Sequence, residues 1–126
     1  MRLCVLFIVA LIAGAVFDPH PALARGSAAG EPVSPATAVT VADLPPEAQR
    51  TLQLIKQGGP FAYERDGVMF GNFEKLLPLR ERGYYREYSV KTPGISSRGA
   101  RRIVVGRDGE SYYTDDHYAS FRRIRE

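Results

Sequence analysis

Side chains suited to acid–base and phosphate chemistry gather in the C-terminal third of this 126-residue chain. They are a carboxylate in a tyrosine-rich run, a basic cluster, and a histidine followed by a tyrosine: Glu87, Arg98, Arg101, Arg102, His117 and Tyr118. A carboxylate can act as a general base, and histidine, the side chain whose ordinary pKa lies nearest neutral pH, can act as a general acid. Guanidinium groups can bind two oxygens of one phosphate and stabilise the charge that builds on phosphorus.

These groups suffice to cleave RNA, because its 2′-hydroxyl is an internal nucleophile. A base removes the hydroxyl proton, an acid protonates the leaving 5′-oxygen, and cations stabilise the phosphorane, so no metal, thiol or other cofactor is required. In an extended segment Arg98 and Arg102 point to one side and Arg101 to the other. The pattern predicts a metal-independent ribonuclease in which Glu87 is the base and His117 the acid. Arg98 and Arg102 would bind the phosphate, and DNA, which lacks the 2′-hydroxyl, should not be cleaved.

Each of these residues also has an ordinary structural interpretation. Most strand glutamates lie on a solvated face beside an arginine, charge clusters are commonly surface segments, and a single histidine can be idle in a turn. The alternative function is a catalytically inactive, secreted RNA- or polyanion-binding module. A metal-dependent nuclease that uses Asp115, Asp116 and His117 is a third hypothesis, and it is weakened because adjacent side chains converge poorly on one ion.

Residues 1–24 have the pattern of a secretory signal peptide. A short positive start precedes an apolar run from Leu3 to Phe17, and Ala22-Leu23-Ala24 offers a cleavage site of small residues. We expect cleavage after this site, secretion to the extracellular space, and no membrane attachment of the mature chain. Cys4 and His20 leave with the segment, so the mature chain has no thiol and His117 is its single histidine.

Residues 25–42 are rich in Ala, Gly, Ser, Pro and Thr and contain no aromatic side chain. Such a segment cannot bury enough apolar surface to fold alone, which predicts a flexible low-complexity leader. The folded ribonuclease domain is expected over residues 43–126. The formal charge of +3 and the isoelectric point of about 9.2 favour a polyanionic partner.

The domain is predicted to be α+β, with one N-terminal helix packed on a small antiparallel sheet of four to five strands. Apolar residues recur on one helical face between a cap at Asp43 and a stop at Gly58-Gly59-Pro60; they are Leu44, Ala48, Leu52 and Ile55. Short β-type runs fall at residues 61–63, 68–70, 83–91, 103–105 and 112–114, and residues 117–124 close the chain. Asp108-Gly109 is a hairpin signal.

From Leu44 onward the sequence closely resembles the bacterial extracellular guanyl-specific ribonucleases, the barnase-like family. The resemblance rests on motifs in the same order along the domain: Leu44-Pro45-Pro46-Glu47-Ala48, Gly59-Pro60-Phe61, Asp66-Gly67-Val68, Gly83-Tyr84-Tyr85, Glu87-Tyr88, Thr92-Pro93-Gly94, Arg98-Gly99, Arg101-Arg102-Ile103 and Tyr112-Tyr113-Thr114-x-Asp116-His117-Tyr118. It implies the microbial ribonuclease fold and the roles already given to Glu87, His117 and the two arginines. The implied product is a 2′,3′-cyclic phosphate, which is then hydrolysed to a 3′-phosphate.

The resemblance also implies a guanine site, which the residues alone did not indicate. It matches the loop Phe70-Gly71-Asn72-Phe73-Glu74. Glu74 would accept hydrogen bonds from the ring N–H and amino group of guanine, and the backbone N–H groups of residues 71–73 would meet its carbonyl oxygen. Phe70 would stack on the base, and Tyr118 would lie beside the acid and near the bound base.

The implied partners are single-stranded RNA and a small acidic protein inhibitor of the barstar type in the producing cell, and we expect a monomer. The same chemistry serves scavenging of RNA and toxicity to competitors.

Three features depart from the family pattern. The disulfide common in close relatives is absent, Phe73 stands where a polar residue is usual, and the Arg122-Arg123-x-Arg125 tail is more basic than expected. The tail would either strengthen RNA binding at low salt or be only a solvated end of the chain.

Overall fold

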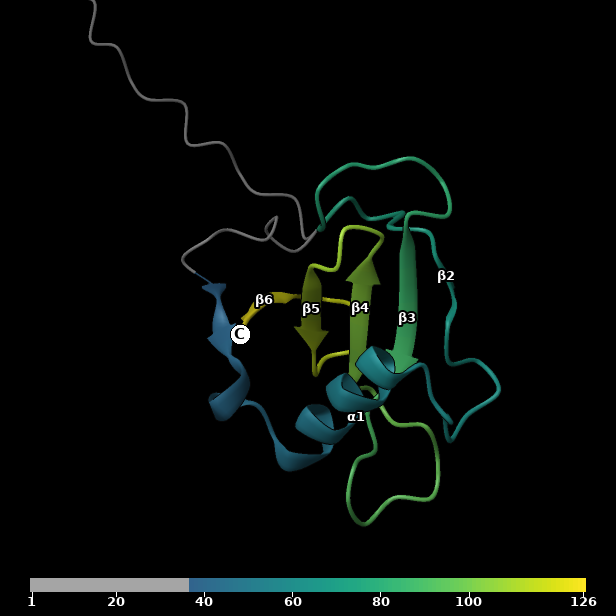
Figure 1. Cartoon of the computed structure of the whole chain (residues 1–126), viewed down its shortest axis with the longest axis vertical. Coiled ribbons are helices and arrows are strands. Elements are labelled where there is room, and N and C mark those ends of the chain that lie inside the picture. The colour runs from purple at the N-terminus through teal and green to yellow at the C-terminus, as the bar shows by residue number, and fades with distance from the viewer. Residues whose placement is uncertain (1–36) are drawn as a thin grey trace, which may run out of the picture.

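The computed structural model describes residues 37–126, which form one twisted sheet with a single α-helix across one face (Figure 1). The elements follow the order β1 (Val39–Thr40), the 3-10 helix η2 (Val41–Asp43), α1 (Pro46–Gln57), β2 (Val68–Phe70), β3 (Tyr85–Ser89), β4 (Arg102–Gly106), β5 (Ser111–Thr114) and β6 (Arg122–Arg125). The strands lie in the spatial order β1-β6-β5-β4-β3-β2. The predicted signal peptide and the predicted leader as far as residue 36 lie outside the described residues.

Helix α1 buries the face that its apolar spacing predicted. Leu44, Ala48 and Leu52 are buried, and Ile55 packs against the same cluster. The helix begins at Pro46, after Pro45, and Asp43 does not cap it: its carboxylate instead accepts a hydrogen bond of 2.8 Å from Thr40. The predicted stop is confirmed, because Gly58 takes a left-handed φ of 83° and donates back to the last turn.

The sheet contains more strands than expected, and one pair in it is parallel. β2 to β6 are joined by antiparallel ladders, whereas β1 pairs with β6 in parallel. Val39 and Thr40 therefore belong to the sheet, and the ordered fold starts before residue 43. A strand of two residues leaves no periodic pattern in a sequence, and here it exists only through its pairing with β6.

The 61–63 run, expected to be extended, forms no strand. The Asp66 carboxylate accepts the backbone N–H groups of Tyr63 (3.1 Å) and Ser89 (2.6 Å), so the segment closes into a turn beside the end of β3. Phe61 packs instead on the ring of Tyr88, with centroids 5.0 Å apart. The final segment is also only partly extended, since residues 117–121 form a turn before β6.

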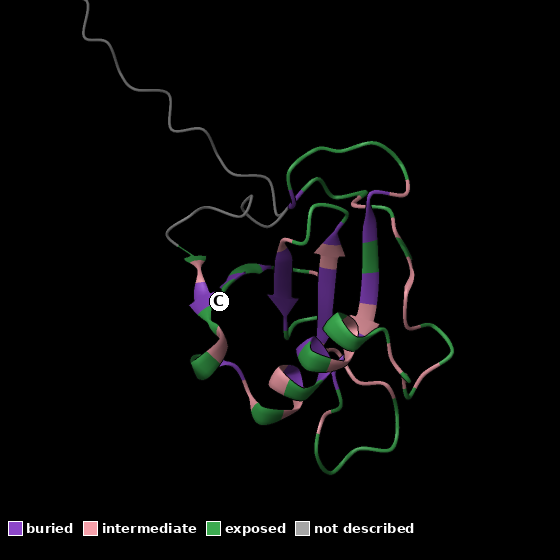
Figure 2. Ribbon diagram, viewed as in Figure 1, coloured by how far each residue is buried: buried purple, intermediate pink, exposed green. Residues whose placement is uncertain are grey.

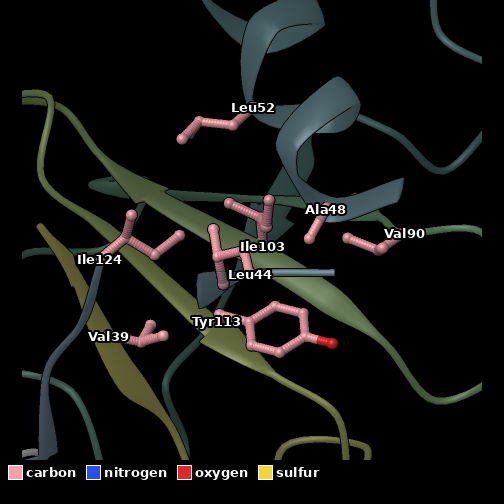
Figure 3. Close-up of a cluster of buried hydrophobic side chains, with 8 residues drawn as sticks. All are labelled: Val39, Leu44, Ala48, Leu52, Val90, Ile103, Tyr113 and Ile124. Carbon is pink, nitrogen blue, oxygen red and sulfur yellow. The ribbon is translucent and has the colours of Figure 1, made fainter. Parts of the chain in front are cut away.

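Hydrophobic clusters cover both faces of the sheet. The helix-side core lies between α1 and the strands (Figure 3) and comprises Val39, Leu44, Ala48, Leu52, Val90, Ile103, Tyr113 and Ile124. The site-side core lies on the other face and comprises Leu76, Leu77, Tyr84, Tyr85, Val104, Tyr112 and Phe121. Burial is accordingly concentrated in the central strands (Figure 2). Within residues 37–126 no helix is long and apolar enough to cross a membrane.

Candidate active site

An open pocket of about 450 Å³ lies on the sheet face away from α1. It is lined by Arg65, Met69, Phe70, Gly71, Asn72, Phe73, Glu74, Leu76, Glu87, Arg98, His117, Tyr118 and Phe121. The fold thus brings together nearly all the residues that the sequence proposed for the acid–base pair, the phosphate and the guanine. Among the predicted set, Arg102 alone is not part of the lining.

Glu87 occupies the floor of this pocket. The residue is only 6% exposed, so the solvated surface position considered from the sequence is wrong. Its Oε2 atom accepts a hydrogen bond of 2.6 Å from the Tyr118 hydroxyl, and its Oε1 atom lies 3.7 Å from Nη2 of Arg98. β3 positions the carboxylate through its ladder with β4, in which Glu87 is opposite Val104. A carboxylate held in this way can accept a proton from a ligand in the pocket.

The arginines of the basic cluster lie on both faces of the sheet, as the alternation of side chains in an extended segment predicted. Arg101 turns to the helix side, where its Nη1 lies 3.9 Å from Oε2 of Glu47. Arg98 turns to the pocket and is fixed by a hydrogen bond of 2.9 Å from its Nε to the Ser89 hydroxyl. Its Nη2 is buried and has no hydrogen-bond partner among the described residues. A buried donor without an acceptor suits an anionic oxygen of a ligand.

Arg102 lies behind the pocket wall and is 2% exposed. Its Nη1 donates to the carbonyl oxygens of Gly99 (2.8 Å) and Arg101 (2.7 Å), and its Nε donates to the Tyr118 hydroxyl (3.2 Å). Tyr118 in turn donates to Glu87, so one phenol links the buried cation to the carboxylate. Burial, followed by this hydrogen bond to Glu87, raises the pKa of Tyr118, so the phenol remains a donor at neutral pH.

His117 is exposed at the rim, in a turn with unusual backbone geometry. Both His117 (φ 54°) and Tyr118 (φ 71°) adopt left-handed conformations. The backbone N–H of His117 donates to the carbonyl of Ala100 (3.1 Å), which ties the histidine to the arginine segment. The Tyr118 ring stacks on Phe70, with centroids 5.3 Å apart and an interplanar angle of 24°. The sequence allowed for a turn at His117, and histidine is enriched at positive φ, but nothing in the sequence indicated two successive left-handed residues, because tyrosine does not favour this region.

The 70–74 loop presents its backbone and its carboxylate to the pocket. The Asn72 amide forms two hydrogen bonds with the backbone of Leu77, at 3.0 and 3.1 Å, and thereby fixes the loop. The exposed Phe73 ring lies over Gly71, where a Cβ atom would come within 2.6 Å of it. No described residue forms a hydrogen bond or ion pair with the Glu74 carboxylate. It is therefore available to accept hydrogen bonds from a ligand.

The metal hypothesis finds no ligand set among the described residues. The Asp116 carboxylate accepts hydrogen bonds from Thr114 and Ser120, and Asp115 lies 3.5 Å from the guanidinium of Arg122. Across residues 37–126 no group of three or more His, Cys, Asp or Glu side chains could hold a metal ion.

Four residues of the lining were missed from the sequence: Arg65, Met69, Leu76 and Phe121. From the sequence, Arg65-Asp66-Gly67 indicates only a turn between two short β-type runs. It reaches the pocket because Gly67, two residues further on, donates to the Glu87 carbonyl (2.8 Å) and anchors the turn beside the carboxylate. No described residue forms a hydrogen bond, ion pair or ring contact with its guanidinium. The position of Arg65 in the pocket follows from the register in which β2 pairs with β3, and the sequence alone does not show this register.

A larger depression, of about 890 Å³, lies along β6 and the β4–β5 turn. It contains none of the predicted site residues. Its three arginines, Arg80, Arg123 and Arg125, are matched by three carboxylates, Asp108, Glu110 and Glu126. This balance of charge gives it no preference for an anion, so the smaller pocket is the candidate active site.

Comparisons with known proteins show the family to which the chain belongs. Residues 27–125 match the family model described as ribonuclease, and the chain belongs to this family of microbial ribonucleases. It is 58% identical over 84 residues to guanyl-specific ribonuclease St of Saccharopolyspora erythraea, covering 67% of this chain and 83% of that protein. It is 54% identical over 87 residues to guanyl-specific ribonuclease Sa of Kitasatospora aureofaciens, covering 68% and 91%.

Solved structures give the same result for the fold. A structure of ribonuclease Sa2 in complexes with mononucleotides superposes with a TM-score of 0.71 at 50% identity, over 74% of this chain and 98% of that one. A second, of ribonuclease Sa2 with guanosine-2′-cyclophosphate, gives a TM-score of 0.68 at 50% identity, over 71% and 96%. The predicted microbial ribonuclease fold is confirmed.

Proposed function

We propose that this chain is a guanyl-preferring endoribonuclease that cleaves single-stranded RNA on the 3′ side of guanosine. One observation carries the proposal: a buried carboxylate, an arginine with an unsatisfied buried donor and an exposed histidine line the same pocket. The relatives named guanyl-specific ribonucleases, and a neighbour bound to guanosine-2′-cyclophosphate, support the choice of substrate.

In the first step Glu87 accepts the proton of the 2′-hydroxyl, and the 2′-oxygen forms a bond to phosphorus. The bond from phosphorus to the 5′-oxygen breaks, and His117 gives its proton to that oxygen. Arg98 contacts the phosphate through its buried donor, and Arg102 adds charge from behind Tyr118, so both stabilise the phosphorane. The products are a 2′,3′-cyclic phosphate and a free 5′-hydroxyl.

In the second step water replaces the departed nucleotide. The imidazole of His117 accepts a proton from water, and the water oxygen bonds to phosphorus. The bond from phosphorus to the 2′-oxygen breaks, and Glu87 returns its proton to that oxygen. The product is a 3′-phosphate. Both steps use the same two residues in exchanged roles, and neither requires a metal ion or another cofactor.

Guanine is recognised by the 70–74 loop. Glu74 accepts hydrogen bonds from the ring N–H and amino group of the base, a donor pair that adenine lacks. The backbone N–H groups of Gly71, Asn72 and Phe73 face its carbonyl oxygen, and Phe70 and Tyr118 provide aromatic surface beside it. Asn72 assists by holding the loop closed on Leu77.

We also propose how the chain is processed, exported and inhibited in the cell that produces it. Residues 1–24 act as a signal peptide that is removed. Of the leader predicted over residues 25–42, the part before β1 precedes the folded domain. The mature enzyme is secreted and monomeric, and an acidic protein inhibitor of the barstar type protects the producing cell. The exposed Arg65 and the exposed imidazole of His117 at the pocket would suit such an inhibitor electrostatically.

Cleavage of the four dinucleotides GpA, ApA, CpA and UpA in excess EDTA tests this function. We expect rapid release of guanosine 2′,3′-cyclic phosphate from GpA and little reaction of the other three. A Glu74→Gln variant should lose most of the preference for GpA over ApA while it retains the fold. A folded wild-type sample that cleaves none of the four would contradict the proposal and favour the binding module instead.

A further inference from the structure

The turn that carries His117 holds two successive non-glycine residues in left-handed conformations. L-amino acids avoid this region because Cβ approaches the following carbonyl, so such residues persist only where the surrounding structure holds them. Strain of this kind gathers at functional sites. The contacts that maintain it here are therefore candidates for a role in the reaction.

The Asp116 carboxylate supplies those contacts. Its Oδ1 accepts hydrogen bonds from the Thr114 hydroxyl (2.8 Å) and the Ser120 backbone N–H (2.9 Å), and its Oδ2 accepts one from the Ser120 hydroxyl. The Thr114 hydroxyl in turn accepts the backbone N–H of Tyr118 at 3.2 Å. The Asp116 carboxylate thus connects Thr114, at the buried end of β5, to Ser120, on the far side of the turn. Both left-handed residues lie between these two points in the chain.

The same turn is attached to the phosphate-binding segment on its other side. The His117 N–H donates to the Ala100 carbonyl, between Arg98 and Arg102. Asp116 itself is not part of the pocket lining. Burial acts to raise the pKa of Asp116, but the hydrogen bonds from Ser120 and Thr114 outweigh it, so the pKa lies below its ordinary value. The turn therefore binds the ionised carboxylate.

We propose that Asp116 is a positioning residue for the ribonuclease reaction: it closes the 114–120 turn and so holds His117 where the imidazole can protonate the leaving oxygen. The inference rests on the proposed function and adds to it a residue that touches no substrate. Asp116 acts through backbone geometry, and the charge of the carboxylate serves to recruit its three donors.

Three variants separate geometry from charge. Asp116→Ala removes all three hydrogen bonds. Asp116→Asn removes the charge but retains an Oδ1 acceptor for Thr114 and Ser120, and its new amide N–H can donate to the Ser120 hydroxyl in place of the bond to Oδ2. Asp115→Ala is the matched control, because Asp115 is the neighbouring acid, is exposed, and lies 3.5 Å from the guanidinium of Arg122 outside the turn network. Steady-state kinetics on GpA would be measured for each, with the folded fraction checked by circular dichroism.

We expect Asp116→Ala to lower kcat by about 10- to 100-fold, since displacement of a reacting group by about 1 Å has effects of this size. KM should change less than about twofold, because the guanine loop is untouched. Asp116→Asn should retain kcat within about threefold of wild type, and Asp115→Ala should match wild type. Unchanged kcat in Asp116→Ala, or an equal loss in the Ala and Asn variants, would overturn the positioning role.

Two further measurements keep the test decisive. If Asp116→Ala does not fold, Ser120→Ala, which removes only the bond to Oδ2, should still lower kcat severalfold with KM unchanged, and a full kcat would refute the proposal. Hydrogen exchange of the His117 backbone amide tests the turn without using activity. Faster exchange in Asp116→Ala than in Asp115→Ala is expected, and equal rates would contradict the proposal even if the wild-type chain cleaved no dinucleotide.

Discussion

The two faces of the sheet bury different kinds of side chain. Against α1, the sheet buries mainly apolar residues such as Val90 and Ile103, both fully buried. On the opposite face it also buries Glu87, Ser89 and Arg102. Buried ionisable groups cost free energy unless other groups satisfy them, and replacing them with apolar residues is often neutral or stabilising. The difference indicates that the helix side provides stability, whereas the site side gives up some stability to hold a reactive arrangement.

The sharpest test of this division is to replace the two reacting groups. Glu87→Gln and His117→Ala should each lower kcat/KM by about 10²- to 10⁴-fold, because each removes one proton-transfer partner. Glu87→Gln keeps the acceptor for Tyr118 but leaves Arg98 without its carboxylate, so the free energy of unfolding should fall by no more than about 3 kcal/mol. Chemical denaturation beside steady-state kinetics measures both. A large loss of stability without loss of turnover would contradict the division.

The reverse behaviour is expected on the helix side. Ile103→Val removes one buried methylene beneath α1 and should lower the free energy of unfolding by about 0.5–1.5 kcal/mol. Turnover of GpA per folded molecule should stay at the wild-type value, because Ile103 points away from the pocket. A fall in kcat measured well below the unfolding transition would show that the two faces are not independent.

Arg65 extends the comparison to the rim of the pocket. Because its guanidinium has no partner among the described residues, we expect it to contribute one phosphate contact to RNA binding. Arg65→Gln should therefore reduce the slope of log kcat/KM against log salt by about 0.7, a difference of about threefold between 50 and 200 mM salt. Arg50→Gln, an exposed arginine on α1, is the control and should leave the slope unchanged.

The smallest expected effect concerns the stability of the Asp116 turn. Because the pKa of Asp116 is lowered in the folded protein, its hydrogen bonds stabilise the fold above the ordinary value of 3.8, and this contribution is lost as pH falls through the lowered pKa. Ser120→Ala should thus be less stable than wild type by about 0.5 kcal/mol at pH 6. The difference should shrink as pH falls below 3.8 and through the lowered pKa of Asp116. A difference that did not depend on pH would assign the loss to the hydroxyl alone.

Some features followed from local sequence and others depended on tertiary contacts. Spacing predicted the buried face of α1 and its glycine stop, and alternation predicted that Arg98 and Arg101 would diverge. These features depend on chain geometry over a few residues. The Arg65-Asp66-Gly67 turn also followed from local sequence, whereas β1 and the placement of Arg65 in the pocket depend on partners far along the chain, so no local pattern indicates them.

The guanine loop illustrates the same limit within the site. Residue types alone suggested only a turn at 70–74, and it was the resemblance to known ribonucleases that supplied its role. The hydrogen bonds between Asn72 and Leu77 that fix the loop, and the left-handed turn at His117, are visible only in the folded chain. Composition and spacing identified which groups could react, and the fold determined how they are held.

The pH dependence of kcat/KM for GpA, compared among wild type, Glu87→Gln and His117→Ala, tests the central claim most directly. Wild type should give a bell-shaped profile that falls at low pH as the base becomes protonated and at high pH as the acid loses its proton. Glu87→Gln should lose the acidic limb and His117→Ala the basic limb, each at a much reduced rate. A variant that retained both limbs at wild-type height would show that the replaced residue is not a proton-transfer group, and the assignment of this pocket as the catalytic site would be wrong.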